Sequence, residues 1–191
     1  MKLNYILDIF VSNLLIYGSY TLITLLWSYF YNLGNQIDFL SFYFPFGIIV
    51  LAFLFFGNRI IIGFLLSYIS FFFVLKNYNL YLPFNDFFVI SASHLFCVPL
   101  ILFVLRKFNI TVGAGEKYRL DKTNIYHVLL ITFLSTIVFG TLLISTSILQ
   151  EDRGGFLKFI IGHFLGGAVL IISMKLLVNL PTIFINFIKS S

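Results

Sequence analysis

This 191-residue sequence carries very little charge. Only 10% of its residues are charged, 60% are hydrophobic, and the mean hydropathy is +1.04. Soluble domains usually contain about 25% charged residues, so a water-soluble globule of this size is excluded. Disorder is excluded as well, because disordered chains are poor in hydrophobic residues. The composition therefore predicts an integral membrane protein.

The sequence also lacks the residue patterns of most enzymes. Its single cysteine, Cys97, excludes an intramolecular disulfide. It contains no glycine-rich phosphate loop, no metal-spaced group of Cys and His, and no pair of acids within one expected helix. The net charge of +5 does not indicate nucleic-acid binding, because Lys and Arg lie mostly between apolar runs. We therefore expect no enzymatic activity, no metal, no resident cofactor and no nucleic-acid partner.

What the sequence does contain is a series of long apolar runs separated by short polar turns. At about 20 residues per membrane-spanning helix, the chain has room for about six spans. The runs are apolar on all faces rather than alternating, which favours helices over barrel strands. The expected helices are 9–31, 39–57, 59–76, 86–106, 125–149 and 157–179. The predicted fold is all-α, a polytopic bundle with residues 1–179 as the membrane domain and residues 180–191 as a short cytoplasmic tail at the membrane interface.

The distribution of Lys and Arg predicts how the bundle is oriented. Three of these residues fall on one side, and nine fall on the other, namely Lys2, Arg59, Arg106, Lys107, Lys117, Arg119, Lys122, Lys175 and Lys189. Cytoplasmic loops are enriched in Lys and Arg, so both termini and the loop at 107–124 should face the cytoplasm. The first apolar run is expected to be a retained helix, because Asp8 interrupts it and no signal cleavage site follows. The expected location is a bacterial cytoplasmic (inner) membrane, with Asp8 at its cytoplasmic interface and tyrosines forming aromatic belts.

Three segments in series resemble a known family. Residues 43–49 read Tyr-Phe-Pro-Phe-Gly-Ile-Ile, and a Gly-Asn-Arg turn at 57–59 leads into a helix that contains Gly63. A fourth-helix segment runs from Ser93 through Cys97 to a basic end, and residues 161–167 read Ile-Gly-His-Phe-Leu-Gly-Gly. Over residues 5–179 this order is similar to MASE1 domains, which are bacterial membrane-integral sensory modules. The resemblance implies a role in signal transduction and, with no output domain after Ser191, a stand-alone module that passes its state to another membrane or signalling protein.

The family's polar positions are altered in this sequence. His94 stands where the family often has Asn, Cys97 where it has Glu, and His163 where it has Asp. The candidate signal or ligand pocket therefore comprises His94, Cys97 and His163. Counting residues inward from the helix starts places both histidines at similar depths, about 9–12 Å. We expect the fourth and sixth helices to pack together and bring the two imidazoles into one pocket, as a structural pair, a ligand or proton site, or a pair of haem ligands.

Glycine and proline mark the expected helix contacts. Pro45 and Gly47 form a bend or hinge near the start of the second helix, where Gly lets a neighbour approach. Gly162, Gly166 and Gly167 give a Gly-x-x-x-Gly face on the sixth helix, which packs within the chain or in a dimer.

Two other functions stay open at this level. Six helices in about 190 residues also resemble the substrate-binding subunits of energy-coupling-factor transporters, although the first helix here lacks the alanines through which those subunits dock. An accessory subunit of a larger membrane complex is the further alternative. In each case the partners are membrane lipids and another protein.

Overall fold

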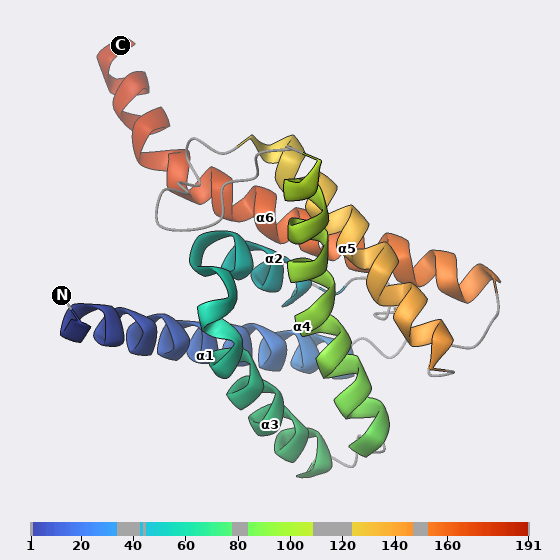
Figure 1. Cartoon of the computed structure of the whole chain (residues 1–191). Coiled ribbons are helices and arrows are strands. Elements are labelled where there is room, and N and C mark those ends of the chain that lie inside the picture. Colours follow the sequence, from blue (N-terminus) through green and yellow to red (C-terminus); the bar gives the residue numbers. More distant parts are fainter. Residues whose placement is uncertain are drawn as a thin grey trace.

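The computed structural model describes residues 2–33, 43, 45–77, 84–108, 124–146 and 153–190. They form six α-helices and one 3₁₀ turn (Figure 1). In chain order these are α1 (Lys2–Leu33), α2 (Pro45–Phe56), η2 (Gly57–Ile60), α3 (Ile61–Asn77), α4 (Phe84–Lys107), α5 (Ile125–Ser145) and α6 (Arg153–Ser190). The predicted all-α class is confirmed.

Five stretches of the described chain are long and apolar enough to cross a membrane. They are Tyr5–Leu26, Pro45–Val74, Phe84–Lys107, Ile125–Ser145 and Phe156–Asn179. The protein is therefore a helical, multi-pass membrane protein by length and composition. The expectation of about six spans is met in part, because the second stretch combines α2, η2 and α3, where two separate spans were expected. With 12 residues, α2 is only about 18 Å long, against about 30 Å of hydrocarbon in a bilayer.

The turn between α2 and α3 reverses the chain direction. Gly57 has a φ of +66°, a left-handed conformation that favours glycine, and it ends α2 as the Gly-Asn-Arg segment predicted. The rings of Phe53 and Phe64 stack across this turn with centroids 5.8 Å apart. Farther away, Tyr43 and Tyr68 both contact His94. Because residues on either side of the turn meet again at one imidazole, the chain doubles back between α2 and α3, and we call this arrangement the hairpin although the two helices scarcely pack on each other.

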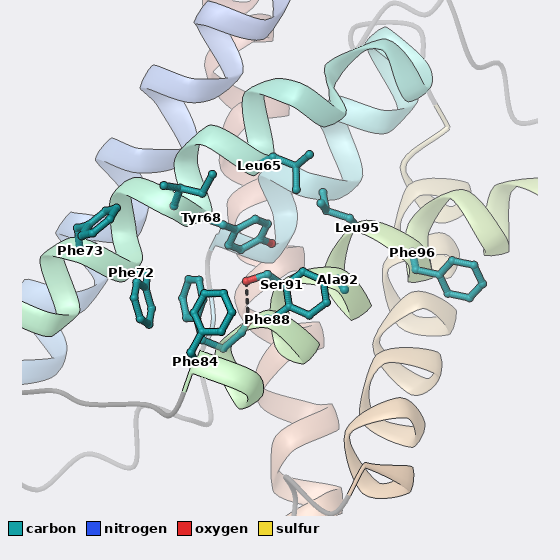
Figure 2. Close-up of a pocket in the computed structure, with 12 residues that line it drawn as sticks. Leu65, Tyr68, Phe72, Phe73, Phe84, Phe88, Ser91, Ala92, Leu95 and Phe96 are labelled. Atoms are coloured by element: carbon teal, nitrogen blue, oxygen red, sulfur yellow. Dashed lines mark hydrogen bonds between the residues drawn. The ribbon is translucent and has the colours of Figure 1, made fainter.

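On the side of α3 that faces α4, the two helices diverge. Apolar side chains, mostly phenylalanine, line a groove between the two helices (Figure 2).

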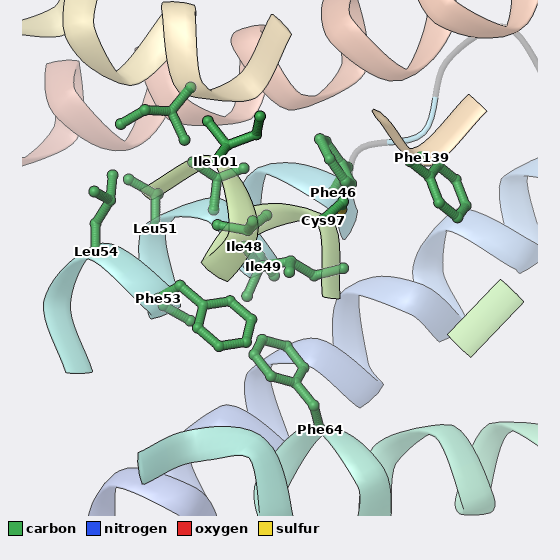
Figure 3. Packing of buried hydrophobic residues seen from close by; sticks show 14 of the residues in the cluster. Phe46, Ile48, Ile49, Leu51, Phe53, Leu54, Phe64, Cys97, Ile101 and Phe139 are labelled. Atoms are coloured by element: carbon green, nitrogen blue, oxygen red, sulfur yellow. The ribbon is translucent and has the colours of Figure 1, made fainter. Parts of the chain in front are cut away.

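The short helix α2 forms the centre of the fold. Every residue from Pro45 to Leu54 is buried, and the helix lies between α1 and α6 while also contacting α4 and α5. Its side chains pack against Phe64 of α3 and Phe139 of α5 (Figure 3). A helix that is apolar on all faces is stable only when it is enclosed on all faces. Here the other helices enclose it.

The helices α1 and α3 run side by side in the same direction. The Asn13 side-chain oxygen accepts a hydrogen bond from the Gly63 backbone N–H, and the Ser67 hydroxyl donates to the Tyr17 carbonyl. A step of four residues along α1 thus matches a step of four residues along α3, so the two helices are parallel. Asp8 and Arg59 form an ion pair of 2.9 Å at the start of this pair, although no role was expected for Asp8. The N-terminal part of α1 and the α2–α3 turn therefore lie at the same end of the molecule.

Helix α6 is longer than expected. It runs without interruption from Arg153 to Ser190 and passes Pro181, where the sequence suggested that the last span had ended and a tail had begun. Its C-terminal part projects beyond the other helices (Figure 1). A position of residues 180–191 at the membrane interface stays a prediction.

The hairpin gives a test of the orientation, which is itself a prediction. Cysteine is introduced at position 2, 85 or 124 in a Cys97→Ser background and labelled with an impermeant thiol reagent. We expect Lys2→Cys and Asn124→Cys to react only from the cytoplasmic side and Asn85→Cys only from the outside, because Lys and Arg concentrate on the first side. If positions 2 and 124 reacted from opposite sides, the stretch 45–74 would cross the membrane once, and the predicted common side of both termini would be wrong.

Candidate functional site

The imidazole of His94 lies in the interior of α4 and is almost completely buried, with 3% of the residue exposed. Among the described residues, neither of its ring nitrogens has a hydrogen-bond partner. A buried polar group without a partner costs about 1–3 kcal/mol, and most buried polar atoms in proteins are satisfied. This imidazole is the least satisfied large polar side chain in the described part of the molecule.

The second histidine lies beside it. His163 of α6 is buried, and its Nδ1 lies 3.3 Å from the Phe159 carbonyl oxygen one turn earlier. If Nδ1 carries the proton and donates this bond, Nε2 is left as an acceptor. The centroids of the two imidazole rings are 6.2 Å apart, which confirms the predicted juxtaposition of His94 and His163.

The way in which the two histidines meet differs from the prediction. Helix α4 packs mainly on α5, and α6 packs mainly on α2 and α5, so direct packing of α4 on α6 does not bring the rings together. Gly162 and Gly166 are buried, and Gly167 beside them makes a close backbone approach to α2. A Cβ on Gly47 would lie 2.7 Å from the Gly167 carbonyl oxygen, so the helix that Gly167 admits is α2. Pro45 begins α2 and is buried with it.

Aromatic rings enclose both imidazoles. The ring of Phe139 stacks on His94 with centroids 3.9 Å apart, and Phe159 lies 4.0 Å from His163. Three rings each contact both histidines, and together with the histidines we call them the imidazole cluster: His94, His163, Tyr43, Phe46 and Phe139. The imidazole cluster is therefore one buried point at which four helices meet, namely α2, α4, α5 and α6. Tyr43, two residues before α2, joins them there.

A chain of tyrosine hydroxyls adjoins the imidazole cluster. The Tyr20 hydroxyl donates to that of Tyr68 at 3.2 Å, and it lies 3.0 Å from that of Tyr43. Because the single hydrogen of Tyr20 is directed to Tyr68, Tyr43 is the donor to Tyr20. The sequence did not single out these residues, since tyrosine in an apolar run is equally typical of a membrane interface, but Tyr20 and Tyr68 are buried in the core.

The third predicted pocket residue has a different position. Cys97 is buried, and its Sγ lies 3.3 Å from the carbonyl oxygen of His94 in the preceding turn of α4. In the described part of the chain, no side-chain hydrogen bond joins this thiol to the imidazole cluster. The described residues also contain no group of three or more His, Cys, Asp or Glu side chains that could hold a metal ion.

The residues present do not fit a haem group between the two histidines. Tyr43, Phe46 and Phe139 each lie within about 6 Å of both imidazoles, with centroid distances from 3.9 to 6.1 Å. A porphyrin plane would have to occupy the volume that these rings fill, in a core where side chains pack at the density of organic crystals.

Comparisons with known proteins add no identity. No family, no curated protein and no solved structure matches this chain.

Proposed function

We propose that this protein is a sensory or interaction module of a bacterial inner membrane, without enzymatic turnover of its own, and that the imidazole cluster sets its state. The observation that supports this proposal is His94, which is enclosed by aromatic rings and has both nitrogens unsatisfied. An apolar side chain of similar shape would be more stable at this position. A side chain that lowers stability at its position is typical of a functional site.

The position of the imidazole cluster suits a switch. A signal that adds a donor, an acceptor or a proton at His94 changes the packing at the point where α2, α4, α5 and α6 meet. Polar groups buried at the junction of several helices couple strongly to packing, because the surrounding medium screens them weakly. The state is then passed to a partner protein, as the resemblance to MASE1 domains implies.

Replacement of His94 tests the proposal. Phenylalanine and leucine remove the two unsatisfied nitrogens, so we expect at least one of these variants to raise the free energy of unfolding by about 1–3 kcal/mol. In a protein of this size that corresponds to roughly 2–4 °C in the unfolding midpoint for each kcal/mol. Unfolding is measured by thiol-reactive fluorescence, since Cys97 is the single cysteine and is fully buried.

The proposal also requires that these variants bind the partner protein less than the wild-type protein does. We expect in-cell photocrosslinking to a partner to fall in His94→Phe and to persist in His127→Gln, which changes an exposed histidine of α5. A large loss of stability in both His94 variants would make the imidazole a structural group and overturn the proposal. So would an unchanged crosslinking pattern in a stabilised variant.

A further inference from the structure

A groove lies between α3 and α4, and none of the residues of the imidazole cluster lines it. Its volume is about 630 Å³, within the range of sites for small organic molecules. Twelve residues line it, and among them are Phe72, Phe73, Phe84, Phe87, Phe88 and Phe96 (Figure 2). Such a lining suits an apolar ligand with a planar ring, because aromatic pairs prefer stacked or edge-to-face contacts.

The groove has an exposed rim and a buried wall. Phe73, Phe84 and Phe88 are each about 60% exposed, whereas Tyr68 and Ser91 are 6% and 7% exposed. Both flanking helices belong to candidate membrane spans, so the rim faces hydrocarbon once the protein is in a bilayer. Its occupant therefore comes from the lipid phase.

The buried wall offers one hydrogen-bond donor. Ser91 uses its hydroxyl hydrogen in a bond of 2.8 Å to the Phe87 carbonyl oxygen, as the dashed line in Figure 2 shows. Tyr68 is the last member of the hydroxyl chain that runs from Tyr43 through Tyr20, so it accepts from Tyr20 and keeps its own hydrogen. In the described part of the chain no hydrogen bond takes that hydrogen, and Tyr68 lines the groove, so an occupant of the groove can supply the acceptor.

The depth of this donor narrows the chemistry of the occupant. Ser91 lies seven residues from the start of α4, and Tyr68 lies nine residues from the end of α3. These separations correspond to about 10 Å and about 14 Å along the helices. Half of the hydrocarbon layer is about 15 Å thick, so the donor lies deep in it. The ester carbonyls of a phospholipid, anchored by a charged head group, lie too near the interface to reach this donor.

We propose that this groove binds a lipid-soluble quinone, with a ring carbonyl accepting the hydrogen bond from Tyr68 and the apolar chain lying among the phenylalanines. A quinone is neutral and planar, and it carries its acceptors on the ring that the aromatic lining stacks against. The inference rests on the proposed sensory function, because it names the class of signal. The ring of Tyr68 lies nearly parallel to His94, with centroids 6.2 Å apart and an angle of 11°, so an occupant held by Tyr68 is one ring away from the imidazole cluster.

Direct binding tests the inference. A radiolabelled, fully substituted benzoquinone with a ten-carbon chain is equilibrated with the full-length protein in detergent micelles, and empty micelles give the background. We expect saturable binding to the wild-type protein that weakens about three- to tenfold in Tyr68→Phe, the loss of one hydrogen bond. Ala92→Trp places an indole in the groove at an exposed lining position and should abolish binding without touching the hydroxyl chain.

Two controls make the result decisive. Tyr17→Phe removes a tyrosine hydroxyl that bonds Ser70 outside the groove, and it should leave the affinity unchanged. A ten-carbon fatty acid should not compete with the quinone. Equal binding by Ala92→Trp, or competition by the fatty acid with no effect of Tyr68→Phe, would overturn the inference. Binding is measured without reference to His94, so a failure here leaves the stability and crosslinking results for His94 standing, and the reverse also holds.

Discussion

Replacing Gly63 by alanine is expected to lower the free energy of unfolding by about 3 kcal/mol or more, the upper range for overpacked sites. A Cβ at this position would lie 2.5 Å from the backbone oxygen of Asn13 and 3.1 Å from its Cα. Backbone atoms cannot rotate away as a flexible side chain can, so α1 and α3 would have to separate along their common contact. The unfolding midpoint of the purified protein, followed through exposure of Cys97, measures the effect.

The matched control is Gly18, which lies in α1 five residues after Asn13, the residue that Gly63 contacts. A Cβ at Gly18 would meet nothing within 4 Å. Alanine there should leave stability unchanged or raise it by up to about 1 kcal/mol, because glycine is a poor helix former. Equal destabilisation by both substitutions would show that the close contact between α1 and α3 does not exist in the folded protein.

Replacing Asn13 by leucine is expected to cost about 3 kcal/mol, because it leaves two partly buried backbone groups, the Arg59 carbonyl and the Gly63 N–H, without this partner. Its Nδ2 donates to the carbonyl oxygens of Ile9 and Arg59 at 2.9 and 2.8 Å, and its Oδ1 accepts from the Gly63 backbone N–H at 2.7 Å. Gly63 is in the first turn of α3, where backbone N–H groups have no partner within the helix. A side chain from α1 thus caps α3.

Ser19→Ala serves as the comparison for Asn13→Leu. The Ser19 hydroxyl is exposed and donates to the Leu15 carbonyl oxygen of its own helix, so its removal leaves no buried group unsatisfied. We expect a change below about 0.5 kcal/mol, typical of surface substitutions. A leucine at position 13 that unfolded at the same temperature as the wild-type protein would contradict the capping role.

Local chemistry made much of the secondary structure predictable. Pro45 starts a helix, and the Gly-Asn-Arg segment makes a turn. Hydroxyl side chains inside apolar helices commonly bond their own backbone. Thr24, Ser91 and Thr132 do so through the carbonyl four residues earlier. These features depend on neighbours within one or two helical turns, which the sequence states directly.

The histidine pair was predictable for a related reason. Burying an imidazole in lipid is costly, so both histidines had to turn inward, and counting residues along two helices placed them at the same depth. The observed centroid distance of 6.2 Å fits that reasoning. The helices that create the meeting point did not follow from it, because depth fixes a position along the membrane normal and leaves the neighbours around the axis open.

The sequence by itself determined that this chain is a helical membrane protein, that a turn follows the second helix at Gly57, and which polar side chains must avoid lipid. Only the tertiary structure decided that the short α2 is the enclosed centre, that Gly47 meets Gly167, and that a chain of tyrosine hydroxyls runs beside the imidazole cluster. The physical reason is the uniform composition of the helices. When every face of a helix is apolar, no periodic pattern marks the face that turns inward, and the rotation of each helix is fixed by its contacts with the others.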